Sequence, residues 1–203
     1  MSDPQPWTAR RYAVIDVEGN GQHPPDLVEL AVVHVVDGII GEPTAWLVRP
    51  DTPILWQARR VHGISNDDVA TAESFDAVRA DVLAHLGDAV IVGHNVGIDL
   101  DVLRRKLPDW RPAKVIDTLR IARRLLPDLG THRLGALVDH LDLATGLPDG
   151  LQPHRAAYDV LVTARLLRAL ATTVAGLTTW DALCELGGPP RMPAPDDATD
   201  RLF

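Results

Sequence analysis

The stretch from Tyr12 to Gly21, YAVIDVEGNG, constrains the fold of this chain most, because an apolar run that reads as a buried strand ends in two acids. Side chains of a strand point alternately to its two faces, so Asp16 and Glu18 share the face from which Ile15 and Val17 point away. Two carboxylates at such close range repel each other unless a cation lies between them, and a divalent metal ion is the usual one. The Gly-Asn-Gly that follows favours a tight turn. An acidic strand end in contact with solvent is the competing interpretation.

The composition predicts one domain with a sizeable core. The chain has 203 residues, 46% of them hydrophobic, which is enough for one core and too little for two independent ones. No apolar run reaches the length of a membrane span, and the first residues, MSDPQP, lack the features of a signal peptide. The single cysteine, Cys184, excludes an internal disulfide and a cysteine-based zinc site. We therefore expect a soluble cytoplasmic protein with no membrane partner.

The charge is unevenly distributed. A formal charge of −8 argues against a protein that coats nucleic acid by electrostatics alone, but an active site built from carboxylates is itself a concentration of negative charge. Residues 104–124 contain eight basic side chains against Asp109 and Asp117. This segment is either a patch that faces phosphates or a solvated helical face.

The order of the expected elements predicts a mixed α/β sheet flanked by helices. Residues 26–36 and 39–48 read as strands that continue the first strand as an antiparallel meander, with a turn at Asp37-Gly38 and an edge position favoured at Pro43. The apolar runs 89–92 and 115–116 are typical of buried parallel strands. Helical patterns cover residues 72–86, 99–107, 118–126, 131–141, 155–174 and 180–186, the last one capped by Thr179.

The remaining segments read as connections. Residues 49–66 are rich in turn formers, and residues 59–64 are expected to form a loop with exposed functional groups. We expect one domain over 8–177, a short helix within 178–188, and a proline-rich, acidic tail over 189–203 without fixed structure.

Two further groups of polar residues strengthen the metal interpretation. Asp99 follows His94-Asn95 where a buried strand gives way to a helix, and the carboxyl ends of strands are where α/β sheets place their sites. His154 precedes Asp159 by five residues, and Pro153 places the histidine in a loop or first turn while the acid lies on the helix. A histidine that can move, next to an acid that a helix holds in place, suits general-base chemistry.

These residues resemble the DEDDh family of 3′-5′ exonucleases, which are DnaQ-like and similar to the proofreading subunit of bacterial replicative polymerases. The family motifs D-x-E, H-N-x-x-x-D and H-x-x-x-x-D are matched in order by Asp16 and Glu18, by His94, Asn95 and Asp99, and by His154 and Asp159. The sister group with a tyrosine four residues before the last aspartate is not matched, since Arg155 stands there. The resemblance extends over residues 12–170.

The resemblance implies an RNase H-like fold and two Mg²⁺ or Mn²⁺ ions, about 4 Å apart, that act on both ends of an in-line displacement. Asp16 would bridge the two ions, Glu18 and Asp159 would complete the site that activates water, and Asp99 would hold the second ion. His154 would take the proton of the water. Carboxylate oxygens suit such hard cations.

The resemblance also predicts a substrate surface, formed by Gly19, His62, Ile64, His94, Asn95 and Ile98. Two positions depart from the family pattern: Gly19 replaces a threonine that contacts the terminal nucleotide, and Ile98 replaces a phenylalanine that packs on it. His62 and Ile64 would form a wall for the base, although a role in stabilising the turn explains His62 equally well.

The expected function is release of 5′-mononucleotides from single-stranded or frayed 3′ ends, DNA rather than RNA. A DEDDh ribonuclease of the oligoribonuclease or RNase T kind is the first alternative, because the motifs do not distinguish ribose from deoxyribose. The second is a module that binds a polymerase or sliding clamp through its tail, since Arg201-Leu202-Phe203 ends like clamp-binding peptides but lacks their upstream glutamine.

Overall fold

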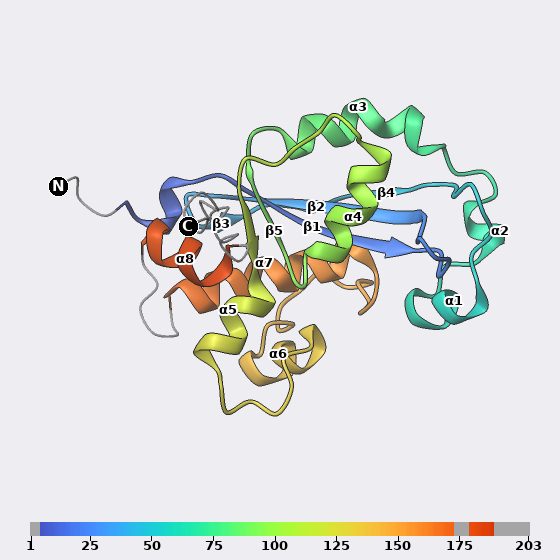
Figure 1. Ribbon diagram of the computed structural model, residues 1–203. Helices are drawn as coiled ribbons and strands as arrows, with labels where there is room; N and C mark the ends of the chain where they lie inside the picture. The colour runs from blue at the N-terminus through green and yellow to red at the C-terminus, as the bar shows by residue number, and fades with distance from the viewer. Residues whose placement is uncertain (1–4, 173–178, 189–203) are drawn as a thin grey trace, which may run out of the picture.

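The two acids of the first strand lie on the central strand of a six-stranded sheet (Figure 1). The computed structural model describes residues 5–172 and 179–188. The strands are β1 (Tyr12–Gly19), β2 (Leu27–Val36), β3 (Ile39–Ile40), β4 (Thr44–Leu47), β5 (Val90–Gly93) and β6 (Val115–Asp117). Their order is β3-β2-β1-β5-β6, with β4 also paired to β2. β1 pairs antiparallel with β2 and parallel with β5, which in turn pairs parallel with β6. The predicted mixed sheet is confirmed.

The helices cover both faces of this sheet. α3 (Phe75–Leu86) and α4 (Gly97–Lys106) lie on one face, whereas α5 (Thr118–Leu125), α6 (Leu134–Leu141), α7 (Ala156–Thr172) and α8 (Trp180–Gly187) lie on the other (Figure 1). A short 3₁₀ helix, η1 (Trp7–Ala9), precedes β1. None of the described helices is long and apolar enough to cross a membrane.

The alternation along β1 divides the core into two layers. Tyr12 and Val14 pack in the cluster that contains α7, and Ala13 and Ile15 pack in the cluster that contains α3 and α4. Because Asp16 continues the first set, its side chain points toward α7, the helix that carries Asp159. α7 is buried along its length, and each fully buried leucine on it contributes roughly 1.5–3 kcal/mol through the hydrophobic effect.

The predicted strand over residues 39–48 is wrong as one element. It forms two short strands, β3 and β4, and both pair with β2. Pro43 lies between them, where its missing N–H removes no bond from the sheet.

The predicted loop over residues 49–66 is also wrong in part, because it contains α1 (Trp56–His62) and begins α2 (Asn66–Val69). Gly63 ends α1 in the left-handed conformation, with φ of 78°, and Ser65 and Asp68 form a capping box that starts α2. Both are local signals that the sequence carries.

The remaining helix boundaries agree with the sequence pattern to within a few residues. α6 begins at Leu134 rather than at residue 131, and Thr179 caps α8 through the N–H of Ala182 as predicted. The domain boundary expected at residue 177 and the tail over 189–203 lie outside the described residues, so the division into 8–177, 178–188 and 189–203 stays a prediction.

Candidate active site

Three of the four predicted acids converge at the end of β1. One carboxylate oxygen from each of Asp16, Glu18 and Asp159 can be chosen so that all three lie within 4.8 Å of one another. The first two residues are two positions apart on β1 and therefore share a face. Asp159 is buried in the first turn of α7, which packs on that face. The strand and the helix together thus fix the spacing of the three acids.

Asp99 approaches from the other face of the sheet. It lies in the first turn of α4, is 6% exposed, and its Oδ1 accepts a hydrogen bond from the backbone N–H of Val17 at 3.0 Å. Asp99 is not one of the three acids that share the 4.8 Å cluster. It nevertheless contributes the largest charge repulsion on Asp16, which places the two carboxylates near each other.

Burial and mutual repulsion raise the pKa of all four acids. Burial, followed by the charges of Asp99, Asp159 and Glu18, raises the pKa of Asp16 well above its usual range. Burial raises the pKa of Glu18 to about 8 and that of Asp99 to about 8, with neighbouring carboxylates adding to both. The pKa of Asp159 rises to about 6 through burial, and His154 opposes this rise.

This cluster fits a divalent cation. The donors are all carboxylate oxygens, the ligands that Mg²⁺ and Mn²⁺ prefer, and among the described residues no other acid, cysteine or histidine joins the cluster. Bringing these acids together destabilises their charged forms, and a bound cation would reverse that penalty.

His154 lies beside the cluster on the segment that leads into α7. It is exposed, and its backbone is left-handed, with φ of 63°. Its charged form stabilises the carboxylate of Asp159, as the lowering effect on the pKa of that residue indicates. Position and exposure suit a group that exchanges protons with solvent.

A hollow of about 990 Å³ opens from His154 and Asp159 along the sides of α4, α5 and α6. Its lining includes Ile98, which is 60% exposed, and two exposed arginines, Arg123 and Arg133. Of the eight basic residues in segment 104–124, Arg123 is the one that lines this hollow. Others are engaged elsewhere, as Arg104 is with Asp101 and Lys106 with Asp26.

His94 and Asn95 line the same hollow. Part of their role is structural. The ring nitrogens of His94 lie 3.0 Å from Thr118 Oγ1 and 2.9 Å from the carbonyl oxygen of His132, so both already have partners. The backbone N–H of Asn95 donates to Asp117, and its side chain remains exposed. His94 thus ties β5 to α5 and to the wall of the hollow.

The predicted base wall of His62 and Ile64 is not the exposed loop that the sequence suggested. His62 ends α1 and is 4% exposed, and its Nδ1 accepts a hydrogen bond from the N–H of Ile64. Ile64 is 3% exposed and packs in a small cluster with Ile54 and with Val28 of β2. Such burial favours the turn-stabilising role of His62.

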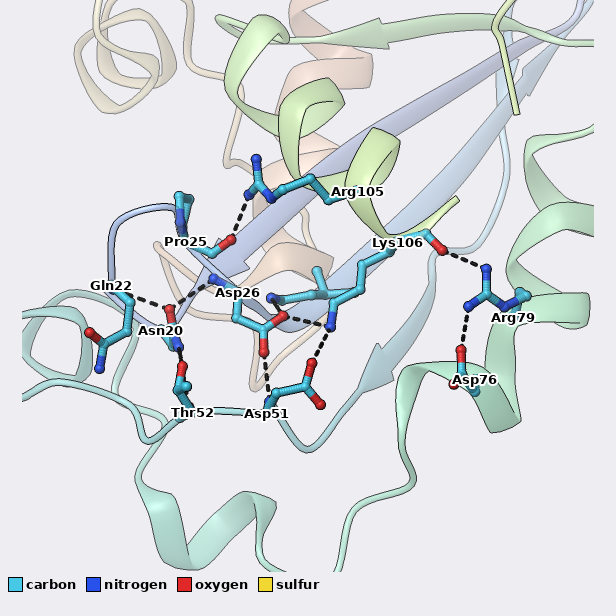
Figure 2. A network of polar contacts seen from close by, with 11 residues as sticks. Asn20, Gln22, Pro25, Asp26, Asp51, Thr52, Asp76, Arg79, Arg105 and Lys106 are labelled. Atoms are coloured by element: carbon cyan, nitrogen blue, oxygen red, sulfur yellow. Dashed lines mark hydrogen bonds and ion pairs between the residues drawn. The ribbon is translucent and has the colours of Figure 1, made fainter. Parts of the chain in front are cut away.

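A side chain at Gly19 would pack tightly against the turn that follows it. A Cβ atom there would lie 3.2 Å from the Cβ of Pro25, and the pairing of β1 with β2 shifts register between Glu18 and Gly19. Asn20, fully buried, organises the turn: its Oδ1 accepts from the N–H groups of Gln22 and Asp26 (Figure 2).

The same network joins this turn to the end of the helix that carries Asp99. The ammonium group of Lys106 lies 2.7 Å from Asp26 and 3.2 Å from Asp51, and Arg105 donates to the carbonyl of Pro25 (Figure 2). Sequence reasoning missed these residues, because no local pattern pairs residue 26 with residue 106. It also missed Glu29, whose register partner on β1 is Glu18.

Comparison with known proteins adds independent information. The family model described as the RNase_T exonuclease matches residues 13–167, more than half of the chain. Exodeoxyribonuclease 10 of Escherichia coli K12 is 37% identical over 180 residues, which are 88% of this chain and 76% of that protein. DNA polymerase III of the PolC type from Bacillus subtilis is 34% identical over 163 residues, but these span only 11% of that protein.

Solved structures agree with the fold. Exonuclease X, in complex with 5′ overhanging duplex DNA, superposes with a TM-score of 0.68 at 35% identity and covers 85% of this chain and 99% of its own. Escherichia coli exonuclease I in complex with a dT13 oligonucleotide has a TM-score of 0.66 at 20% identity over 80% of this chain and 41% of its own, and this shows the fold alone.

Proposed function

Because the chain belongs to the RNase_T exonuclease family, and is therefore an exonuclease acting on nucleic acid, we propose that it removes 5′-mononucleotides one at a time from single-stranded or frayed 3′ ends of DNA, using divalent metal ions. A 3′-5′ polarity fits this DnaQ-like family, and the resemblance of the sequence motifs predicts the same polarity. Two relatives, exodeoxyribonuclease 10 and exonuclease X in complex with 5′ overhanging duplex DNA, support DNA as the substrate.

One observation carries the proposal: the carboxylates of Asp16, Glu18 and Asp159 converge within 4.8 Å beside the large hollow. In this proposal Asp16 would hold both of two Mg²⁺ or Mn²⁺ ions, Glu18 and Asp159 would complete one site, and Asp99 would complete the other. When bound, such ions polarise the attacking water and stabilise the charge of the leaving oxygen.

His154 is the proposed general base. A base must reach the attacking water and exchange its proton with solvent, and the exposure of His154 and its place in the same hollow as Asp159 support this role. Asp159 is fixed by α7, so the acid stays in place while the imidazole turns.

The hollow would take the 3′ end of the strand. Ile98 offers an apolar side chain to the terminal nucleotide, and Arg123 and Arg133 offer positive charge to the phosphates on the far wall. Positive charge on this wall offsets the overall charge of −8 that would otherwise repel the strand. Gly19, His94 and Asn95 would border the terminal nucleotide, with His62 and Ile64 behind the Gly19 turn.

The test is digestion of DNA and RNA oligomers of the same sequence and length, with Mg²⁺ and with EDTA in its place. We expect the DNA to be shortened with Mg²⁺ and to stay intact with EDTA. Faster digestion of the RNA would favour the ribonuclease alternative. Failure to shorten either oligomer, in protein that is folded and loaded with Mg²⁺ or Mn²⁺, would contradict the proposed function.

A further inference from the structure

A buried carboxylate lies next to the acidic cluster without belonging to it. Glu29 on β2 is 4% exposed and is the register partner of Glu18 on β1. Directly opposite residues of an antiparallel pair have Cβ atoms about 4.5–5.5 Å apart, so the two side chains share one face. A second acid at this distance adds to the repulsion and helps to raise the pKa of Glu18.

Glu29 is fully engaged by the segment that starts α7. Its Oε2 accepts from Arg155 Nε at 3.0 Å and from the backbone N–H of Ala156 at 2.9 Å, and its Oε1 accepts from Arg155 Nη2 at 2.5 Å. Both oxygens are thus occupied, and Glu29 is not one of the three acids that share the 4.8 Å cluster. The paired N–H groups of a guanidinium and a helix N-terminus are both favourable partners for a carboxylate.

Arg155 connects this pair to the candidate active site. It follows His154 directly, and its carbonyl oxygen accepts hydrogen bonds from the N–H groups of Tyr158 at 2.9 Å and Asp159 at 3.0 Å. His154 has a left-handed backbone, so the chain turns sharply just before the residue that Glu29 holds. The ion pair therefore fixes the start of α7 to the strand beside Glu18.

We propose that Glu29 and Arg155 are positioning residues, which hold His154 and Asp159 at the correct distance from Asp16 and Glu18. This proposal rests on the proposed function. The pair itself touches neither substrate nor metal; it acts through the backbone of residues 154–159. Arg155 stands where a sister group carries a tyrosine, and its side chain is turned toward Glu29 on β2.

A merely structural ion pair would also stabilise the protein, so the experiment must separate stability from positioning. We compare Glu29→Gln, Arg155→Lys, Arg155→Met and the double variant Glu29→Met/Arg155→Met. The double variant replaces the ions by apolar groups of similar length, which commonly restores stability after a buried pair is broken. Arg104→Met is the matched control, because Arg104 also pairs with an acid, Asp101, but both side chains are exposed.

Four quantities are measured: kcat, KM, the melting midpoint in EDTA, and the Mn²⁺ dissociation constant by calorimetry without nucleic acid. We expect Arg155→Met to lower kcat and Mn²⁺ affinity by about 10- to 100-fold, as for other groups that orient metal ligands, with KM little changed. Arg155→Lys keeps the charge but not the paired geometry, so its kcat and Mn²⁺ affinity should lie between those of Arg155→Met and the wild type.

The double variant decides the matter. We expect its melting midpoint to recover toward that of the wild type while kcat and Mn²⁺ affinity stay low. Recovery of kcat together with the midpoint would overturn the proposal, as would an Arg155→Met protein with wild-type kcat and Mn²⁺ affinity. If Arg155→Met does not fold, the double variant and Arg155→Lys give the same decision. Should wild type and Arg104→Met both fail to shorten DNA, the proposed function is wrong, and the Mn²⁺ affinities still test the positioning.

Discussion

Asp99 and Val17 are joined by a hydrogen bond of 3.0 Å from the backbone N–H of Val17 to the carboxylate of Asp99, 82 residues later in the chain. Val17 lies between Asp16 and Glu18, so this bond places the acid of α4 against the strand that carries the first two acids. A single backbone group thus links the second acidic segment to the first.

Asp16→Asn should abolish catalysis without unfolding the protein. The carboxylate proposed to hold both ions contributes several kcal/mol of transition-state stabilisation, so we expect kcat/KM to fall by more than about a hundredfold. The measurement is digestion of single-stranded DNA with Mg²⁺, with the melting midpoint as the check on folding. Asp101→Asn is the control, since Asp101 is exposed and pairs with Arg104. A rate above a tenth of the wild-type rate would contradict the bridging role of Asp16.

His154→Ala should lower kcat by roughly 10²- to 10⁴-fold, the usual contribution of a general base. Because the proposed ligands are unchanged, Mn²⁺ affinity measured by calorimetry should stay near that of the wild type. An equal loss of Mn²⁺ affinity would mean that His154 is a ligand and not the base.

The contribution of Glu18 and Asp99 to the stability of the metal-free protein should fall as the pH rises from about 4 to about 8. In contrast, His34, His62 and His94, whose pKa values are lowered, act in the opposite direction. The folded-state pKa values of Glu18 and Asp99 are raised from 4.5 and 3.8 to about 8, so the native state binds more protons than the unfolded state in this interval. The stability that these groups contribute is present below pH 4 and is lost as the pH rises through the folded-state values. Melting curves in EDTA at several pH values measure this slope.

Mg²⁺ or Mn²⁺ should restore the stability that the acids lose as the pH rises. The effect should be larger at pH 8 than at pH 5, because the ions bind the deprotonated acids. At a hundred times its dissociation constant an ion stabilises the folded state by about 2.7 kcal/mol, which is roughly 5–10 °C for a chain of this size. Asp99→Asn should raise the melting midpoint in EDTA and reduce the shift caused by the ion. A full shift in that variant would exclude Asp99 as a ligand.

Arg123→Ala and Arg133→Ala should weaken binding of single-stranded DNA while leaving kcat nearly unchanged. Each removes a charge from the far wall of the hollow, so KM should rise and the dependence of log KM on log salt should become shallower by about one. Arg104→Ala, outside the hollow, is the control. A fall in kcat without a change in KM would place these arginines at the reacting phosphate.

The sheet and three acids of the site could be predicted from the sequence because their signals are local. The alternation in residues 12–18 sets which face Asp16 and Glu18 share, and the apolar run before His94 marks a parallel strand. Asp159 is predicted by the match to the motif H-x-x-x-x-D, with Pro153 placing His154 ahead of the regular helix.

The missed features depend on contacts between distant segments. Glu29 looks like any polar residue within β2 until the register places it opposite Glu18 and Arg155 closes on it. The burial of Ile64 follows from its contacts with Val28 of β2 and with Ile54 and Val69, and the many turn-forming residues in segment 49–66 gave no sign of this cluster.

Polarity of digestion tests the central claim most directly. A time course on single-stranded DNA labelled at its 5′ end, with Mg²⁺, should give a descending ladder of labelled fragments as 5′-mononucleotides leave the 3′ end. A matched duplex end should be shortened more slowly, since unpairing costs on the order of 1–2 kcal/mol per base step. Immediate release of a labelled mononucleotide, or cutting of a circular strand, would contradict a site that takes a free 3′ end.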